Sequence, residues 1–203
     1  MSISNEIVEL ERMLTAKMLL DPVYIENNLA EFTGEGKIHE YLGCEVKIKS
    51  YSELKGMKGL NELIPSKVGV CILLIENEPN SGHWVALLKY DNNVEFFNSY
   101  GDPPAHEVRL LSDATNESLN QCPRDILNIL DHEYSEGKLV IYNAQRLQKV
   151  SGDIGTCGKH CILRAFMLEH YGLGLGEYLT FIDFMASRLG VDADALVTLL
   201  IDV

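Results

Sequence analysis

Residues 81–101 read SGHWVALLKYDNNVEFFNSYG, and this stretch decides the fold. Apolar and aromatic side chains dominate residues 84–90 and 94–99, and the Asp-Asn-Asn between them is typical of a tight turn. Two strand-length runs joined by such a turn predict an antiparallel hairpin. An apolar run at residues 68–76 precedes the hairpin, separated from it by a loop with proline and glycine, so we expect three consecutive strands.

Helical patterns stand on both sides of this block. In residues 5–20, apolar side chains recur at helical spacing, at Ile7, Leu10, Leu14 and Met18. We expect further helices at residues 24–32, 123–133, 158–171, 177–189 and 192–201, and a fourth strand at residues 138–143. This order predicts an α+β fold, with a small, mostly antiparallel central sheet flanked by helices. A turn at residues 33–36 divides the chain into an N-terminal helical appendage (residues 1–36) and a main domain (residues 37–203).

The composition excludes several classes of function. The chain has 203 residues, with 17 Lys and Arg against 30 Asp and Glu, and a formal net charge of −13. Such an acidic protein lacks the basic surface that nucleic acids and anionic membranes attract, so we expect neither as a partner. The N-terminus has no basic and apolar signal sequence, and the cysteines number five, which is odd. We therefore expect free thiols and a cytoplasmic location.

Cys157 is the candidate nucleophile. It lies in GTCGKHCI, residues 155–162, where a glycine-rich loop enters an apolar helix. A thiol at a helix N-terminus faces unpaired backbone N–H groups and the positive end of the helix dipole, and both favour the reactive thiolate. Gly158 would leave room for a substrate carbonyl to approach. Considered alone, Cys157 also suits the role of a small residue buried at a helix start.

His83 and Asn98 are the candidate partners of this thiol. His83 begins one strand of the predicted hairpin and Asn98 ends the other, so the hairpin makes them neighbours. Asn98 could then accept a hydrogen bond from Nδ1 of His83 and fix the tautomer of a general base. Trp84, the only tryptophan, could shield the imidazole or pack in the core. Taken singly, these residues also suit a surface histidine and a turn asparagine.

A glutamine could supply the remaining catalytic group. Gln145 or Gln148 could donate a side-chain N–H to an oxyanion beside the backbone N–H of Cys157, and we prefer Gln148 because it is nearer in sequence. Both could equally be solvated polar residues. Cys157 and Cys161 flank His160, but no second cluster stands at ligand spacing, so we expect no metal.

In combination, these segments resemble one clan of cysteine proteases. They follow the order Gly-His-Trp, Phe-Phe-Asn-Ser-Tyr-Gly-Asp-Pro-Pro, Leu-Gln and Thr-Cys-Gly-Lys-His-Cys. This order is similar to that of the clan of adenovirus protease (adenain), the SUMO-specific proteases and the proteases of large DNA viruses. The Asn-Ser-Tyr-Gly segment with its two prolines looks most like the viral branch. The resemblance covers roughly residues 68–170.

The resemblance implies a cysteine protease fold of the adenain and SUMO-protease type. It also implies Cys157 as the nucleophile and His83 as the general base. Asn98 is then the orienting residue and Gln148 the oxyanion donor, and Trp84 and Gly158 lie beside the substrate. Such viral enzymes cleave structural precursors after Gly-Gly or Gly-Xaa. The implied partner is therefore a protein substrate with a glycine-rich cleavage site, in the host cytoplasm and the virion.

The sequence also departs from the family pattern. Asn98 is neutral where many members carry an acid, so it stabilises an imidazolium less. The gap between Gln148 and Cys157 is longer than usual, which suggests a small loop insertion. Adenain uses DNA as a cofactor, whereas the net charge of −13 argues against one here, and we expect no cofactor. The alternatives are a deubiquitinase or deSUMOylase with the same fold, an acetyltransferase, or a catalytically degenerate binding module.

Overall fold

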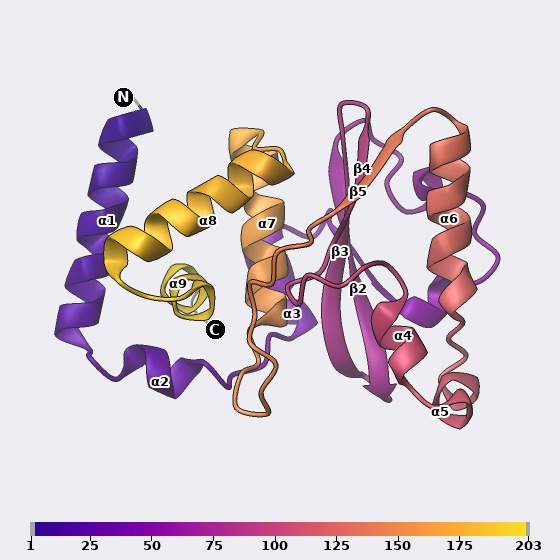
Figure 1. Ribbon diagram of the computed structural model, residues 1–203, viewed down its shortest axis with the longest axis horizontal. Coiled ribbons are helices and arrows are strands. Elements are labelled where there is room, and N and C mark those ends of the chain that lie inside the picture. The colour runs from indigo at the N-terminus through magenta and orange to yellow at the C-terminus, as the bar shows by residue number, and fades with distance from the viewer. Residues whose placement is uncertain (1–2, 202–203) are drawn as a thin grey trace.

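The strands form a single mixed sheet. Within residues 3–201, which the computed structural model describes, the sheet has five strands in the order β1-β2-β3-β4-β5 (Figure 1). Their bounds are β1 Lys47–Ser50, β2 Gly69–Glu78, β3 Ser81–Tyr90, β4 Asn93–Phe97 and β5 Leu139–Tyr142. The central strands β2, β3 and β4 pair antiparallel, whereas β1 and β5 join the edges in parallel. The four predicted strands are confirmed. Strand β1 was not predicted, because a strand of four residues is too short to show a clear hydrophobic period in the sequence.

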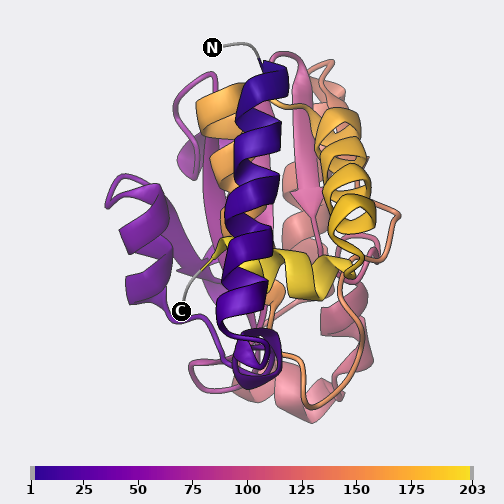
Figure 2. The same cartoon turned by 90° about the vertical axis from the view of Figure 1, so that its left-hand side faces the viewer.

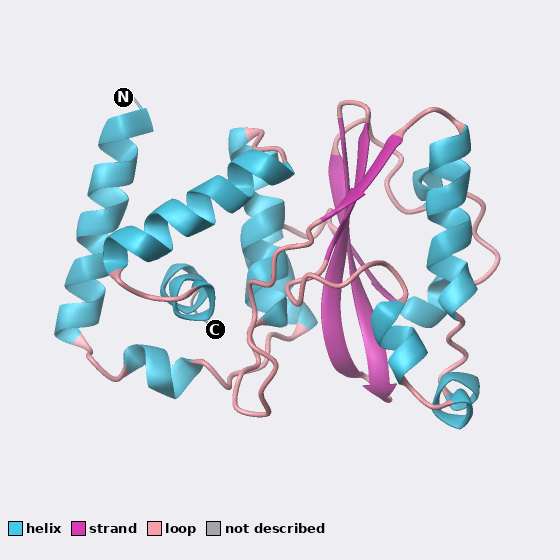
Figure 3. Cartoon of the chain, viewed as in Figure 1, coloured by secondary structure: helices cyan, strands magenta, loops and turns pink. Residues whose placement is uncertain are grey.

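Helices cover both faces of this sheet, as Figures 1 and 3 show. Helix α7 packs on one face of the sheet, and α3 and α9 pack on α7. Helices α1 and α8 lie on the same side and pack on α9, whereas α4, α5 and α6 lie on the other side of the sheet. The bounds are α1 Ile3–Leu20, α2 Tyr24–Asn28, α3 Glu35–Leu42, α4 His106–Leu110, α5 Asp113–Ser118, α6 Pro123–Ser135, α7 Cys157–Tyr171, α8 Leu175–Leu189 and α9 Ala193–Leu200. The α+β fold with a sheet flanked by helices is confirmed. In the described part of the chain, no helix is long and apolar enough to cross a lipid bilayer.

Strand β3 runs through the middle of the sheet, and its side chains pack in two separate hydrophobic cores, one on each face. Trp84, Ala86 and Leu88 pack in the core that contains α7, whereas Val85 and Leu87 pack in the core that contains α6. The alternation follows from the period of two along a strand. Because both faces are buried, the strand is a nearly continuous apolar run in the sequence.

A buried ion pair connects α7 to β4. Arg164 donates to both carboxylate oxygens of Glu95, at 2.8 and 2.7 Å, and both side chains are fully buried. Tyr90 also donates its hydroxyl to Glu95 at 2.8 Å. The pair therefore fixes the helix that carries Cys157 against the strand that leads to Asn98.

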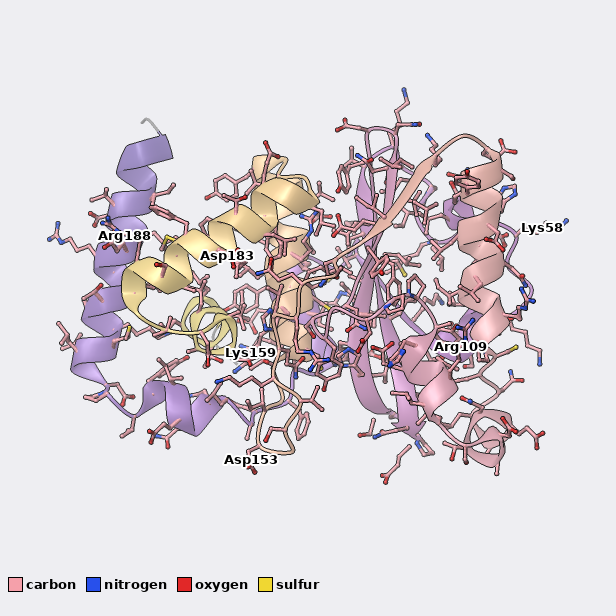
Figure 4. The ribbon with its side chains drawn as sticks, viewed as in Figure 1. Lys58, Arg109, Asp153, Lys159, Asp183 and Arg188 are labelled. Atoms are coloured by element: carbon pink, nitrogen blue, oxygen red, sulfur yellow. The ribbon has the colours of Figure 1, made fainter. Side chains whose placement is uncertain are left out.

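Helix α1 lies alongside the C-terminal helices (Figure 2). Arg188 of α8 reaches across to Glu11 of α1 at 2.7 Å (Figure 4). The turn expected at residues 33–36 is wrong in its second half, because α3 begins at Glu35 and packs on α7. The division of the chain at residue 36 stays a prediction.

Candidate active site

A cavity of 360 Å³ lies at the start of α7, beside the turn that joins β2 to β3. Cys157, the first residue of α7, lines it together with His83 of β3 and Gln148 of the loop after β5. The fold thus brings three of the predicted residues to one cavity from three different elements. Asn98 lies directly behind His83 rather than on the cavity wall.

Asn98 orients the imidazole of His83. Its Oδ1 lies 2.8 Å from Nε2 of His83 and also accepts the backbone N–H of Tyr100 at 3.0 Å. A backbone N–H can only donate, so the oxygen of the amide must be at this position. His83 therefore carries its proton on Nε2 and presents Nδ1 as an unprotonated base. The predicted pair is present, but the predicted atom, Nδ1, is wrong.

Tyr100 fixes the plane of the His83 ring. The two rings are stacked, with centroids 4.3 Å apart and an angle of 8° between their planes. Burial lowers the pKa of His83 to about 4, and the hydrogen bond to Asn98 opposes this effect only in part. The imidazole is therefore neutral at pH 7, which is the form that can act as a base.

Cys157 is almost fully buried, with 6% of its surface exposed. Burial raises the pKa of its thiol, although hydrogen bonds from the backbone N–H groups of Trp84 and Gly158 act in the opposite direction. The helix start predicted a thiolate-favouring site. The N–H groups act in that direction, but removal from water outweighs them. Thiol and imidazole are both neutral in this arrangement, so the proton has to move when the thiol attacks.

The structure separates the two candidate glutamines. Gln148 is buried, lines the cavity and accepts the Ser99 hydroxyl on Oε1 at 2.7 Å. Its Nε2 donates a long hydrogen bond of 3.3 Å to the carbonyl of Ile154. Gln145 instead turns away and donates to Asp183 of α8 at 2.8 Å (Figure 4 labels Asp183). Gln148 is therefore the glutamine that the cavity contains.

Trp84 and Gly158 do not line this cavity within the described residues. The indole N–H of Trp84 donates to the carbonyl of Thr33 at 2.8 Å, and its ring packs in the core. A Cβ on Gly158 would lie 2.4 Å from Cβ of Thr33. Both residues thus pack against the segment ahead of α3, and Phe32 of that segment lines the cavity instead.

Metal ligation finds no support in the described part of the chain, where no group of three or more His, Cys, Asp or Glu residues is arranged to hold an ion. The buried neighbours Cys161 and His160 have other contacts. The Cys161 thiol donates to the carbonyl of Trp84 at 3.4 Å, and Nε2 of His160 lies 3.2 Å from Asp194.

Comparison with known proteins identifies a viral relative. The chain is 34% identical over 165 residues to the uncharacterized protein V9 of Sputnik virophage. The aligned region covers 80% of this chain and 90% of V9. The chain belongs to the same protein family as V9. No family model matches the sequence.

A solved structure shares the fold. The crystal structure of the ASFV pS273R protease superposes with a TM-score of 0.51 at 12% sequence identity, over 87% of this chain and 69% of that protease. The fold that the sequence resemblance implied is therefore present, a mixed sheet flanked by helices as in a viral protease.

Some residues of the site were not singled out from the sequence, and three of them contact the proposed catalytic residues or stand next to them. Tyr100 stacks on His83, Gly82 precedes it on the cavity wall, and Glu107 receives the side-chain N–H of Asn98. Tyr100 and Gly82 stand beside quoted motif residues, so proximity in sequence could have indicated them. Glu107 lies in a short helix after Pro103-Pro104, and only the path of that loop brings it back to Asn98.

Proposed function

We propose that this protein is a cysteine endopeptidase with Cys157, His83, Asn98 and Gln148 as its catalytic residues. The observation that carries the proposal is the fixed tautomer of His83, which leaves its Nδ1 unprotonated in a residue that lines the same cavity as Cys157 and Gln148. The shared fold with a viral protease supports it.

The proposed reaction is acyl transfer from a peptide bond to water. Nδ1 of His83 takes the proton of the Cys157 thiol as the sulfur attacks the peptide carbonyl, and a C–S bond forms. The oxyanion is held by the backbone N–H of Cys157 and by Nε2 of Gln148, whose long bond to Ile154 is readily exchanged. His83 then gives its proton to the leaving amine, and water hydrolyses the thioester with His83 as base.

The proposed substrate is a viral structural precursor that is cleaved after Gly-Gly or Gly-Xaa. The viral origin of the relative V9 supports a viral substrate. Glycine fits a site that burial makes narrow, since Cys157 has little exposed surface and only residues without side chains allow close backbone approach. With this substrate, the enzyme acts in the host cytoplasm and the virion and needs neither cofactor nor nucleic acid.

A peptide ending in a Gly-Gly vinyl sulfone tests the proposal, because the thiol adds to it irreversibly. We expect one adduct, on Cys157, which is lost in Cys157→Ala and retained in the control variant Cys122→Ala, whose cysteine is exposed. Glycine-rich peptides should then be cleaved, with kcat/KM falling by roughly 10²–10⁴-fold in His83→Ala.

The same assay separates the alternatives. Cleavage of a ubiquitin-like fusion but not of glycine-rich peptides would favour a deubiquitinase or deSUMOylase. Absence of any adduct on Cys157 in folded protein would leave the binding module as the better interpretation.

A further inference from the structure

The Asn98 amide lies between His83 and a carboxylate. Its Nδ2 donates to Oε1 of Glu107 and, at 3.5 Å, to the carbonyl of Asp102. Its Oδ1 faces His83 and the backbone N–H of Tyr100. All of these contacts are satisfied by one orientation of the amide. Of the two groups that accept from Nδ2, Asp102 uses its backbone carbonyl and Glu107 its side chain, so a substitution at Glu107 removes an acceptor.

Rotation of the amide by 180° would reverse these contacts. Oδ1 would then meet the carboxylate of Glu107, and Nδ2 would meet the N–H of Tyr100, so both ends would be repulsive. Nδ2 would also face the ring of His83, which would then have to accept at Nε2 and carry its proton on Nδ1. That tautomer cannot take a proton from Cys157.

Glu107 is held where it can fulfil this role. It lies in α4, which follows the buried residue Ala105, whose backbone is in the left-handed region at φ 67°. Its Oε2 has no hydrogen-bond partner among the described residues, although it is buried. Burial raises the pKa of Glu107, and the backbone N–H of Glu107 and then the bond from Asn98 oppose this rise. Glu107 also lines the cavity, so its carboxylate lies against the proposed site. A buried carboxylate oxygen without a hydrogen bond in the described part of the chain requires a reason beyond packing.

We propose that Glu107 is a positioning residue that holds the Asn98 amide, and through it the Nε2–H tautomer of His83, and that its negative charge stabilises the imidazolium formed during catalysis. Asn98 is neutral, so the nearby negative charge belongs to Asp102, which acts against burial to raise the pKa of His83, and to Glu107, which accepts from the Asn98 amide. The catalytic part of this inference rests on the proposed function, whereas the tautomer of His83 does not.

The test is imidazole ¹⁵N NMR of the full chain, with the signals of His83 assigned from a His83→Gln variant. In the wild type we expect the Nε2–H tautomer. Glu107→Leu removes the acceptor, and we expect a mixture of tautomers together with a fall in kcat/KM of up to about 100-fold. The control variant Glu117→Gln, on the exposed surface of α5, should change neither.

Glu107→Gln separates orientation from charge. The glutamine oxygen still accepts from Asn98, so the tautomer should persist, while the pH at which His83 gains its second proton should fall. The other titratable groups near Glu107 and His83 are Asp102, His106, His160, Tyr100 and Cys157, and all are unchanged in this variant.

Retention of a single Nε2–H tautomer in folded Glu107→Leu would overturn the positioning role. If that variant does not fold, retention of a single tautomer in Glu107→Ala overturns the positioning role instead, and an unchanged titration of His83 in Glu107→Gln overturns the role of the charge. A tautomer that shifts as expected in a protein that the vinyl sulfone does not label would show that the proposed function fails while the positioning role stands.

Discussion

The carboxylate of Asp194 accepts the backbone N–H of Lys149 at 2.9 Å. Its other oxygen accepts the hydroxyl of Thr156. Lys149 follows Gln148 in the chain and Thr156 precedes Cys157, so one buried side chain of α9 joins the segments of the proposed oxyanion donor and nucleophile. The C-terminal helix, far from the cavity in sequence, thereby sets the distance between two halves of the site.

Replacement of Asp194 should therefore affect both stability and activity. Asp194→Ala leaves Thr156 and His160 buried without their shared acceptor, and we expect the free energy of unfolding to fall by about 2–4 kcal/mol. Urea unfolding measures this loss. The exposed control Asp183→Asn on α8 should change stability by less than about 0.5 kcal/mol. An equal, small effect of both variants would show that the Asp194 network contributes little.

The protonation states of Cys157 and His83 predict how the thiol reacts with iodoacetamide. Burial raises the pKa of Cys157 and lowers that of His83 to about 4, so between pH 5 and 8 neither group is charged. Only the thiolate is alkylated, so the rate at Cys157 should rise steadily with pH and at pH 7 stay below the rates at exposed Cys44 and Cys122.

Peptide mapping of the alkylated cysteines measures these rates. Fast alkylation of Cys157 at pH 5 that disappears in His83→Ala would contradict the prediction, because it requires a preformed thiolate–imidazolium pair. The reaction would then begin from the charged pair rather than from two neutral groups.

The hairpin shows what the sequence could determine. Its turn and its apolar runs predict the register that places His83 near Asn98, because these signals are local. The atom of His83 that faces Asn98 could not be predicted, since either ring nitrogen can carry the proton and the orientation of the ring depends on contacts with Asn98 and Tyr100 that form only in the fold. The choice of Gln148 over Gln145 followed sequence distance, and it depends physically on which side chain Asp183 draws away.

The roles expected for Trp84 and Gly158 show where sequence reasoning ends. Trp84 follows His83 and Gly158 follows Cys157 in the sequence. Successive side chains of a strand or helix point in different directions, so residues next to the site residues need not face the cavity. The partner of both is Thr33, from a segment outside the resembling part of the chain. No pattern in the sequence joins residue 33 to residues 84 and 158, because the contact arises only when α3 packs on α7.

Gly82 sets the position of His83. A Cβ at Gly82 would lie 1.9 Å from the carbonyl oxygen of Ile75, next to a register shift between β2 and β3. Gly82→Ala must displace one strand, so we expect kcat/KM to fall by about 100-fold through misplacement of His83. The control is Gly36→Ala, on the exposed surface of α3 with open space around it and away from the cavity wall. Similar activity of both variants would show that the strand absorbs the extra methyl without moving His83.

Gly158→Ala distinguishes packing from substrate binding. A methyl group there collides with Thr33, and overpacking of this kind should lower the free energy of unfolding by about 1–3 kcal/mol. The strain should also displace the Thr33 carbonyl from the Trp84 indole, which fluorescence of the single tryptophan reports. The control Gly176→Ala lies on α8 with open space around it, and should not destabilise the protein.

A second change locates the strain. Thr33→Gly removes the colliding Cβ but keeps the carbonyl that Trp84 uses, so the double variant Gly158→Ala/Thr33→Gly should be more stable than the sum of the single changes predicts. A coupling energy of about 0.5–3 kcal/mol in this cycle is expected for residues in contact. If Gly158 instead leaves room for substrate, Gly158→Ala will raise KM with little loss of stability, and the cycle will show no coupling.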